Sequence, residues 1–307
     1  MPRRDHLDAL AIGVITLLCA LWGVQQVAVK VALLQGFPPL TQAALRSAGA
    51  AALCALWIGG RGGVRGLRDA LGGAAAARAG TLAAVLFAAE FVAIYLGLRL
   101  TSASRGVLFL YTAPFFTAAG AHYLLPHERL RPVQALGLAV AFSGVVLAFA
   151  EGLLHGSGGS IVGDALCMLG GALWAATIVL VKGSASLLRI SAAGVLLYQL
   201  AGSMPLLLAG ALLLGEFGQT LHPTPLAWAC LFYQTVIVAF ASYLTWFWLL
   251  MLYPASRLSG FTFLTPAFGI LAGGVLLGEP LSAGLLAGLA AIAVGLQLLN
   301  RRLAVAA

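Results

Sequence analysis

Charged residues are scarce in this chain: they make up 8% of its 307 residues, whereas hydrophobic residues make up 62%. A soluble domain has about 25% charged residues, so this chain lacks the charge needed to cover itself with a polar surface. Its apolar residues lie in long runs that suit helices rather than the short alternating segments of a barrel. The sequence therefore predicts an all-α integral membrane protein.

Metal-binding and catalytic motifs are also missing. The four cysteines stand singly within apolar runs, without a CxxC pair or a His/Cys cluster, so we predict neither a disulfide nor a metal site. His127-Glu128 lacks the second His of a zinc-protease motif, and no Gly-rich loop ends in the Gly-Lys-Ser/Thr of an ATP-binding loop. We expect a protein that is not an enzyme and that needs no cofactor.

Positive charge follows the gaps between the apolar runs. The formal net charge is +8, but most of the 17 Lys and Arg lie in these short gaps, where membrane topology explains them, so no nucleic-acid partner is predicted. If the N-terminus is cytoplasmic, thirteen of the 17 fall on the cytoplasmic side and three on the other. Both termini are therefore predicted to be cytoplasmic.

A membrane-spanning helix needs about 20 apolar residues. This rule predicts ten spans: 9–34, 40–59, 79–99, 104–124, 133–150, 161–182, 191–214, 226–250, 257–277 and 281–299. The longest gap, 60–78, is rich in Gly, Ala and Arg and is expected to be a loop.

One pattern occurs twice. Ala103-Ser104-Arg105 followed by Pro114 returns as Ala255-Ser256-Arg257 followed by Pro266, and both elements are shifted by 152 residues. Proline removes a backbone donor within a helix, and lipid cannot satisfy the freed carbonyl. A matched pair of interrupted spans points to the transport site of a secondary transporter, so we predict that Pro114 and Pro266 are conformational hinges.

The repeat extends along the whole chain. Ala20-Leu21-Trp22 returns as Ala172-Leu173-Trp174, and Gly137 and Gly144 return as Gly288 and Gly295. We therefore divide the chain into a first five-helix repeat, 1–155, and a second, 156–307. Because five is odd, the second copy must enter the membrane from the opposite side. The prediction is two inverted repeats around a central cavity, surrounded by spans one, three, four, six, eight and nine.

Glu90 is the least expected residue, because it lies at mid-depth in the third span, where an ionisable group costs a few kcal/mol. Three interpretations stay open. Glu90 binds a substrate ammonium, it takes up and releases a proton, or it pairs with Arg46, which lies at a similar predicted depth in the second span.

Aromatic and amide residues complete the candidate site. Tyr243 and Trp246 share a helix face at i, i+3, and Trp22 and Gln26 share one at i, i+4. Packing, lipid contact and helix–helix hydrogen bonding are the competing interpretations. The predicted substrate-binding residues are Trp22, Gln26, Glu90, Tyr111, Trp174, Tyr243 and Trp246.

Several of these segments are shared with one known family. They are Ala20-Leu21-Trp22-Gly23, Arg46, the segment from Tyr95 to Ala103 and the turn Gly278-Glu279-Pro280-Leu281. Together with the ten spans and the repeat, they resemble the drug/metabolite transporter superfamily, specifically its ten-helix EamA-type exporters. The resemblance covers nearly the whole chain, and within the family it is greatest to the bacterial exporters of amino acids, including aromatic ones.

This resemblance implies a function and a set of partners. The expected function is a secondary transporter that exports small amphipathic metabolites across the bacterial inner membrane by alternating access, with amino acids that have aromatic or bulky side chains as substrates. The alternative is an exporter of hydrophobic cations or drugs, for which Glu90 is the counter-ion. The expected partners are a small-molecule substrate and the lipid bilayer, and the expected state is a monomer or a weak homodimer.

Overall fold

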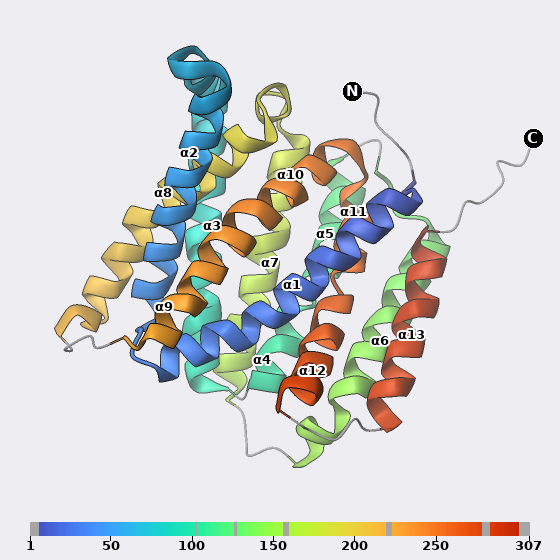
Figure 1. Ribbon diagram of the computed structural model, residues 1–307. Coiled ribbons are helices and arrows are strands. Elements are labelled where there is room, and N and C mark those ends of the chain that lie inside the picture. The colour runs from blue at the N-terminus through green and yellow to red at the C-terminus, as the bar shows by residue number, and fades with distance from the viewer. Residues whose placement is uncertain are drawn as a thin grey trace, which may run out of the picture.

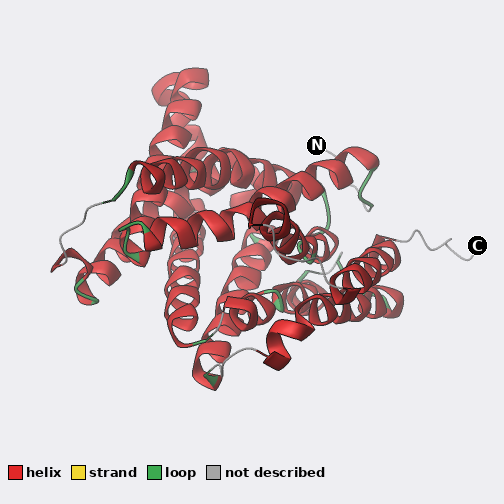
Figure 2. Ribbon diagram, turned by 60° about the horizontal axis from the view of Figure 1, so that its bottom comes forward, coloured by secondary structure: helices red, strands yellow, loops and turns green. Residues whose placement is uncertain are grey.

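Every regular element in the described part of the chain is a helix (Figures 1 and 2). The computed structural model describes residues 6–101, 103–125, 128–155, 160–218, 223–277 and 283–300. The α-helices are α1 Ala9–Leu34, α2 Pro39–Leu71, α3 Ala74–Leu100, α4 Ala103–Leu110, α5 Ala113–Leu124, α6 Pro132–His155, α7 Ile161–Gly183, α8 Ala192–Leu213, α9 Pro225–Phe232, α10 Tyr243–Leu252, α11 Ala255–Phe261, α12 Leu264–Leu277 and α13 Ala283–Asn300. Two short 3₁₀ turns, η1 Leu187–Arg189 and η2 Glu216–Gly218, flank α8, and the π-helix η3 Tyr233–Ser242 joins α9 to α10.

Six helical stretches of the described residues are long and apolar enough to cross a membrane. They are α1, α2, α3, α7, α8 and the continuous stretch from Pro225 to Leu252. The 26 residues of α1 extend over roughly 39 Å at 1.5 Å per residue, which exceeds the ~30 Å thickness of a bilayer core. Shorter apolar helices lie within α6 and α13. The chain is therefore a multi-pass helical membrane protein.

The second helix differs most from its predicted range. We expected a loop over 60–78, but α2 continues to Leu71 and α3 begins at Ala74. Gly63 has φ 56° and ψ −150°, a conformation that glycine adopts without strain, and it kinks α2 at this point. The prediction failed because Gly-rich composition disfavours helix, whereas Arg65 and Arg68 on the exposed end of α2 suit a helix at the membrane surface.

Two apolar runs are each divided into two helices. The first is α4 and α5, separated at 111–112, and the second is α11 and α12, separated at 262–263. Pro114 and Pro266 lie in the first turn of the helix that follows, where a missing N–H is tolerated. At each break a threonine hydroxyl donates a hydrogen bond to a carbonyl three residues earlier, from Thr112 to Phe109 and from Thr262 to Ser259, both at 2.6 Å.

Glycines bring α6 and α13 into close contact. A methyl group on Gly137 would lie 2.7 Å from the carbonyl oxygen of Gly295, and one on Gly144 would lie 2.5 Å from that of Gly288. Because Gly137 meets Gly295 and the later Gly144 meets the earlier Gly288, α6 and α13 are antiparallel. The pair lies at one side of the molecule in Figure 1.

Other helix contacts also join the first half of the chain to the second half. α7 packs on α3 and on α5, whereas α1 packs on the η3 stretch and on α12. α2 packs on α8, its own counterpart. These contacts place α1, α3, α7 and the stretch from α9 to α10 at the centre of the bundle.

Candidate functional site

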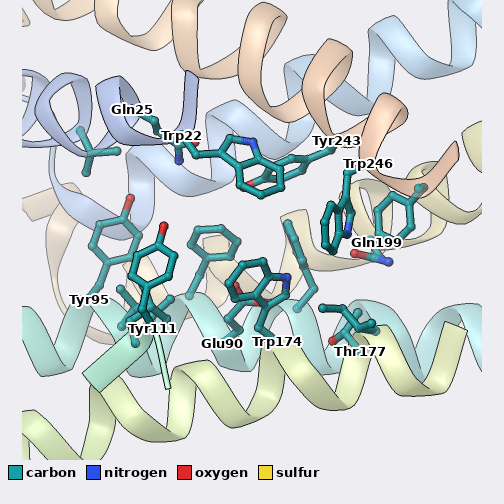
Figure 3. A pocket seen from close by; sticks show the side chains of 17 residues that line it. Trp22, Gln25, Glu90, Tyr95, Tyr111, Trp174, Thr177, Gln199, Tyr243 and Trp246 are labelled. Carbon is teal, nitrogen blue, oxygen red and sulfur yellow. The ribbon is translucent and has the colours of Figure 1, made fainter. Parts of the chain in front are cut away.

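A cavity of about 110 Å³ lies at the centre of the bundle. Both halves of the chain line it, with residues from α1, α3 and α4 on one part and from α7, α8 and α10 on the other. In Figure 3, Trp22, Tyr243 and Trp246 lie across the cavity from Glu90, Trp174 and Thr177. The lining residues are Trp22, Gln25, Val29, Phe87, Glu90, Phe91, Ile94, Tyr95, Leu110, Tyr111, Trp174, Thr177, Ile178, Gln199, Tyr243, Trp246 and Phe247.

Aromatic rings form most of the wall. The Trp22 ring centroid lies 5.5 Å from that of Trp246, 6.2 Å from Tyr243 and 6.3 Å from Trp174. The Tyr111 ring meets Trp174 edge to face at 6.4 Å. These separations fall within the range of favourable aromatic pairs, so the rings hold one another in place around the space they enclose.

A hydrogen bond fixes the orientation of the central indole. Trp22 Nε1 donates to Ser242 Oγ at 2.9 Å, and Ser242 Oγ in turn donates to the carbonyl of Val238 at 2.6 Å. Ser242 is the last residue of the π-helix η3. Such helices are rare and are frequent at functional sites, and here one places Ser242 beside Trp22 and the next turn, Tyr243 and Trp246, in the cavity wall.

Two polar atoms in the wall have no hydrogen-bond partner among the described residues. They are Oε2 of Glu90, a residue that is 7% exposed, and Nε2 of Gln199, a residue that is 1% exposed. Gln25, which is 8% exposed, adds a second amide. Unsatisfied buried polar groups are costly, so this set is suited to bind polar groups of a molecule that enters the cavity.

The pairing of Glu90 with Arg46 is not present. Arg46 is fully buried, and none of its three guanidinium nitrogens makes a hydrogen bond with a described residue. Its guanidinium lies instead 4.2 Å from the centroid of the Phe91 ring, which belongs to the cavity wall. Matching depths made the ion pair feasible, but depth does not determine which way two side chains turn around their helix axes.

Six predicted site residues lie in the wall of this one cavity. They are Trp22, Glu90, Tyr111, Trp174, Tyr243 and Trp246. The side chain of Gln26 lies outside the described residues, and the neighbouring Gln25 lines the cavity. Whether these residues bind a substrate stays a prediction, as does the role of Pro114 and Pro266 as hinges.

The predicted set of surrounding spans needs two corrections. The first correction concerns span nine, which contributes none of the described lining residues. Span four lines the cavity as predicted, through Leu110 and Tyr111 at its break. Span seven, which we did not expect, contributes Gln199 from α8. A lone amide within the apolar run 191–214 is the signal that could have identified Gln199. Tyr95 and Phe91 were missed because aromatic residues at helical spacing are common in any apolar core.

Ligand sets for metals are a separate question. Within the ranges that the structure describes, no group of three or more His, Cys, Asp or Glu side chains is placed to hold a metal ion.

The sequence matches a known family model twice. The model of the EamA-like transporter family matches residues 9–150 and again residues 161–301, which together cover most of the chain. The chain belongs to the EamA-like transporter family. It is therefore a member of a family of membrane transporters.

Curated relatives are also transporters by name. The chain is 30% identical over 176 residues to the uncharacterized transporter YvbV of Bacillus subtilis, covering 57% of this chain and 56% of that protein. It is 28% identical over 185 residues to an uncharacterized transporter of Archaeoglobus fulgidus, covering 60% and 61%. The matched region thus spans less than two thirds of the length of either relative.

One solved crystal structure has the same fold. It superimposes with a TM-score of 0.78 at 17% sequence identity, covering 95% of this chain and 98% of the other. At this identity the likeness supports the fold of the helical bundle alone.

Proposed function

We propose that this protein is a secondary transporter that exports small amphipathic metabolites, namely amino acids with aromatic or bulky side chains, across the bacterial inner membrane. The observation that carries the proposal is the central cavity, to which both halves of a chain from a transporter family contribute. Nine of its 17 lining residues are aromatic, which suits a flat or apolar side chain. Glu90, Gln25 and Gln199 supply the polar groups that an amino-acid backbone needs.

Alternating access between two inverted repeats is the proposed mechanism. Two separate matches to one family model, the paired contacts of α6 with α13 and of α2 with α8, and two broken helices at equivalent positions all support it. We take ten spans with cytoplasmic termini as the topology, and the breaks before Pro114 and Pro266 as the hinges. Exchange of the two conformations between the halves would then open the cavity to one side at a time.

Export of hydrophobic cations is the second candidate, and the unpartnered Glu90 carboxylate in an aromatic wall favours it. A carboxylate and several aromatic faces together attract a lipophilic cation. The cavity volume of about 110 Å³ is small beside the ~300–1,000 Å³ of a pocket for a drug-sized ligand, and it favours the small metabolite.

Counterflow in proteoliposomes separates the two candidates. Vesicles containing the purified protein are loaded with one unlabelled amino acid, and uptake of the labelled compound is followed against protein-free vesicles. We expect exchange of phenylalanine, tyrosine or tryptophan. If no amino acid exchanges while a labelled lipophilic cation does, the amino-acid proposal is wrong and the second candidate replaces it.

A further inference from the structure

Arg46 is a buried cation that pairs with no carboxylate of the described residues; the Phe91 ring lies over its guanidinium, and Glu90 and Tyr243 interact with it electrostatically. Arg46 lies in α2, its side chain is fully buried, and all three guanidinium nitrogens lack a hydrogen bond to any described residue. Arginine stays protonated in proteins, and a buried charge is costly unless it is paired and hydrogen-bonded. The five donors of Arg46 are therefore suited to bind an anionic group.

Arg46 lies directly behind the wall of the cavity. The Phe91 ring, which lines the cavity, covers the guanidinium at 4.2 Å. The positive charge also acts electrostatically on three other lining residues, Glu90, Tyr95 and Tyr243. Only the thickness of this aromatic layer separates Arg46 from the space that a transported molecule would occupy.

We propose that Arg46 is the anion-recognition residue of the cavity and that it binds the carboxylate of the substrate when the Phe91 ring turns aside. This inference rests on the proposed transport function and specifies its substrate class as molecules that carry a carboxylate. Glu90, with an unpartnered oxygen facing the same region, binds the ammonium group. The substrates are then zwitterions rather than hydrophobic cations.

The energetics favour this exchange. A cation–π contact is a weak attraction, whereas a guanidinium and a carboxylate form two charge-assisted hydrogen bonds that are about twice as strong as neutral ones. The Phe91 ring lies over Arg46, and in the proposal a carboxylate replaces this ring contact. An α-amino acid carries both charges on one carbon, so a cation and a carboxylate that are close but unpaired match it better than an ion pair would.

Three phenyl compounds test the proposal on the purified full-length protein. They are 3-phenylpropionate, which carries only the carboxylate, phenethylamine, which carries only the ammonium, and L-phenylalanine, which carries both. Binding is followed by tryptophan fluorescence, excited where the phenyl probes do not absorb, because Trp22, Trp174 and Trp246 lie in the wall. We expect phenylalanine to bind at least about tenfold more tightly than phenethylamine, a difference equal to ~1.4 kcal/mol.

Two arginines of the same helix provide a matched pair of variants. Arg46→Gln should remove the preference for the carboxylate and leave phenethylamine as the tighter ligand, because Glu90 then has no opposing cation. Arg61→Gln is the control, since Arg61 also covers an aromatic ring, Trp57 at 3.6 Å, but is exposed outside the cavity. The ratio of two affinities within one variant does not depend on how much of the protein is folded. Arg46→Lys keeps the charge without the forked geometry, so its ratio should be intermediate.

The outcomes distinguish this proposal from the transport function. The Arg46 proposal is wrong if wild-type protein binds none of the probes, if phenethylamine binds as tightly as phenylalanine, or if Arg46→Gln leaves the ratio unchanged. Amino-acid counterflow together with an unchanged ratio would remove the role of Arg46 and keep the function. A carboxylate preference that Arg46→Gln abolishes, without counterflow of any amino acid, would keep the anion site and remove amino-acid transport.

Discussion

At the scale of single residues, the two halves of the site differ in the position that carries a charge. Glu90 and Ser242 are repeat counterparts, separated by the same 152 residues as the proline pair. Glu90 presents a carboxylate to the cavity, whereas Ser242 accepts the hydrogen bond of Trp22. The first half thus supplies the charge and the second orients the central aromatic ring of the cavity.

Glu90→Gln tests the charge. A hydrogen bond to a charged group contributes about 1.5–3 kcal/mol, so amino-acid counterflow should fall by roughly 10- to 100-fold. Glu90→Asp, which keeps the charge on a shorter side chain, should lose less. Asp69→Asn removes an exposed carboxylate at the end of α2 and serves as the control. Unchanged flux with an unchanged pH profile in Glu90→Gln would show that Glu90 binds neither substrate nor proton.

Trp22→Phe and Ser242→Ala test the orientation of the indole. Each change removes the 2.9 Å hydrogen bond, which contributes about 0.5–1.5 kcal/mol, so each should weaken phenylalanine binding by a few-fold. The double variant should be little weaker than either single one, because both remove the same interaction. Fluorescence titration of the three variants measures this, and strictly additive losses would show that the bond does not position the ring.

The sequence predicted much of this site for a physical reason. Ionisable residues at mid-depth in a span face the protein interior rather than lipid, so Glu90 could be selected without coordinates. Trp22 and Trp174 could be selected because they occupy the same position in the repeated pattern. The separation of Arg46 from Glu90 could not be predicted, because it depends on how α2 and α3 are rotated about their axes. The masking of Arg46 by Phe91 is a matter of side-chain packing, which residue spacing does not record.

At the scale of elements, most helix bounds followed from the apolar runs to within a few residues, whereas α2 continues well past its predicted end, to Leu71. The breaks after α4 and α11 lie close to the repeated prolines. The π-helix η3 could not be predicted, because the run 226–250 has the composition of an ordinary helix. Its repeat counterpart, 81–90, belongs to the regular helix α3. In the structure η3 packs on α1 and α2.

The break between α4 and α5 depends on a glycine in the other half. A methyl group on Gly171 of α7 would lie 2.5 Å from the carbonyl oxygen of Leu110 and 3.3 Å from the nitrogen of Ala113, the two residues that border the break. Gly171→Val should therefore push α4 away from α7. We expect a loss of about 1–3 kcal/mol in stability from this overpacking and a loss of counterflow.

Gly13→Val is the control for this change, since nothing lies within 4 Å of a methyl group at Gly13 of α1. Thermal unfolding in detergent and counterflow are measured for both variants. If Gly171→Val unfolds at the same temperature and transports as well as Gly13→Val, close packing against the break is not needed for either stability or transport.

At the scale of the whole molecule, two buried carboxylates form hydrogen bonds between the two halves of the chain, at opposite ends of the bundle. Glu128, from the first half, accepts from the backbone N–H of Ala255 at 2.6 Å and lies 3.5 Å from Lys182 Nζ. Glu216, from the second half, accepts from the backbone N–H groups of Leu40 and Thr41 at 3.1 and 2.8 Å. Each carboxylate thus caps the first turn of a helix in the other half, where the helix dipole favours negative charge. In Figure 1 the start of α2 and the start of α11 lie at opposite ends of the molecule.

Breaking one of these contacts should open one side of the cavity. Glu128→Gln removes the charge that faces Lys182. Loss of one partner of a buried ion pair costs roughly 3–5 kcal/mol. The end of the bundle that contains Glu128 should therefore be closed in a smaller fraction of the molecules. The readout is a cysteine introduced by Thr177→Cys at a position that lines the cavity and is 2% exposed. The partly exposed Cys230 is replaced by serine, and the other three native cysteines, which are buried, are kept. A membrane-impermeant maleimide added from the cytoplasmic side should label Glu128→Gln about tenfold faster than the parent, whereas Glu216→Gln should increase labelling from the opposite side. Equal acceleration from both sides in either variant would mean that the carboxylates only stabilise the fold and do not close its two ends in turn.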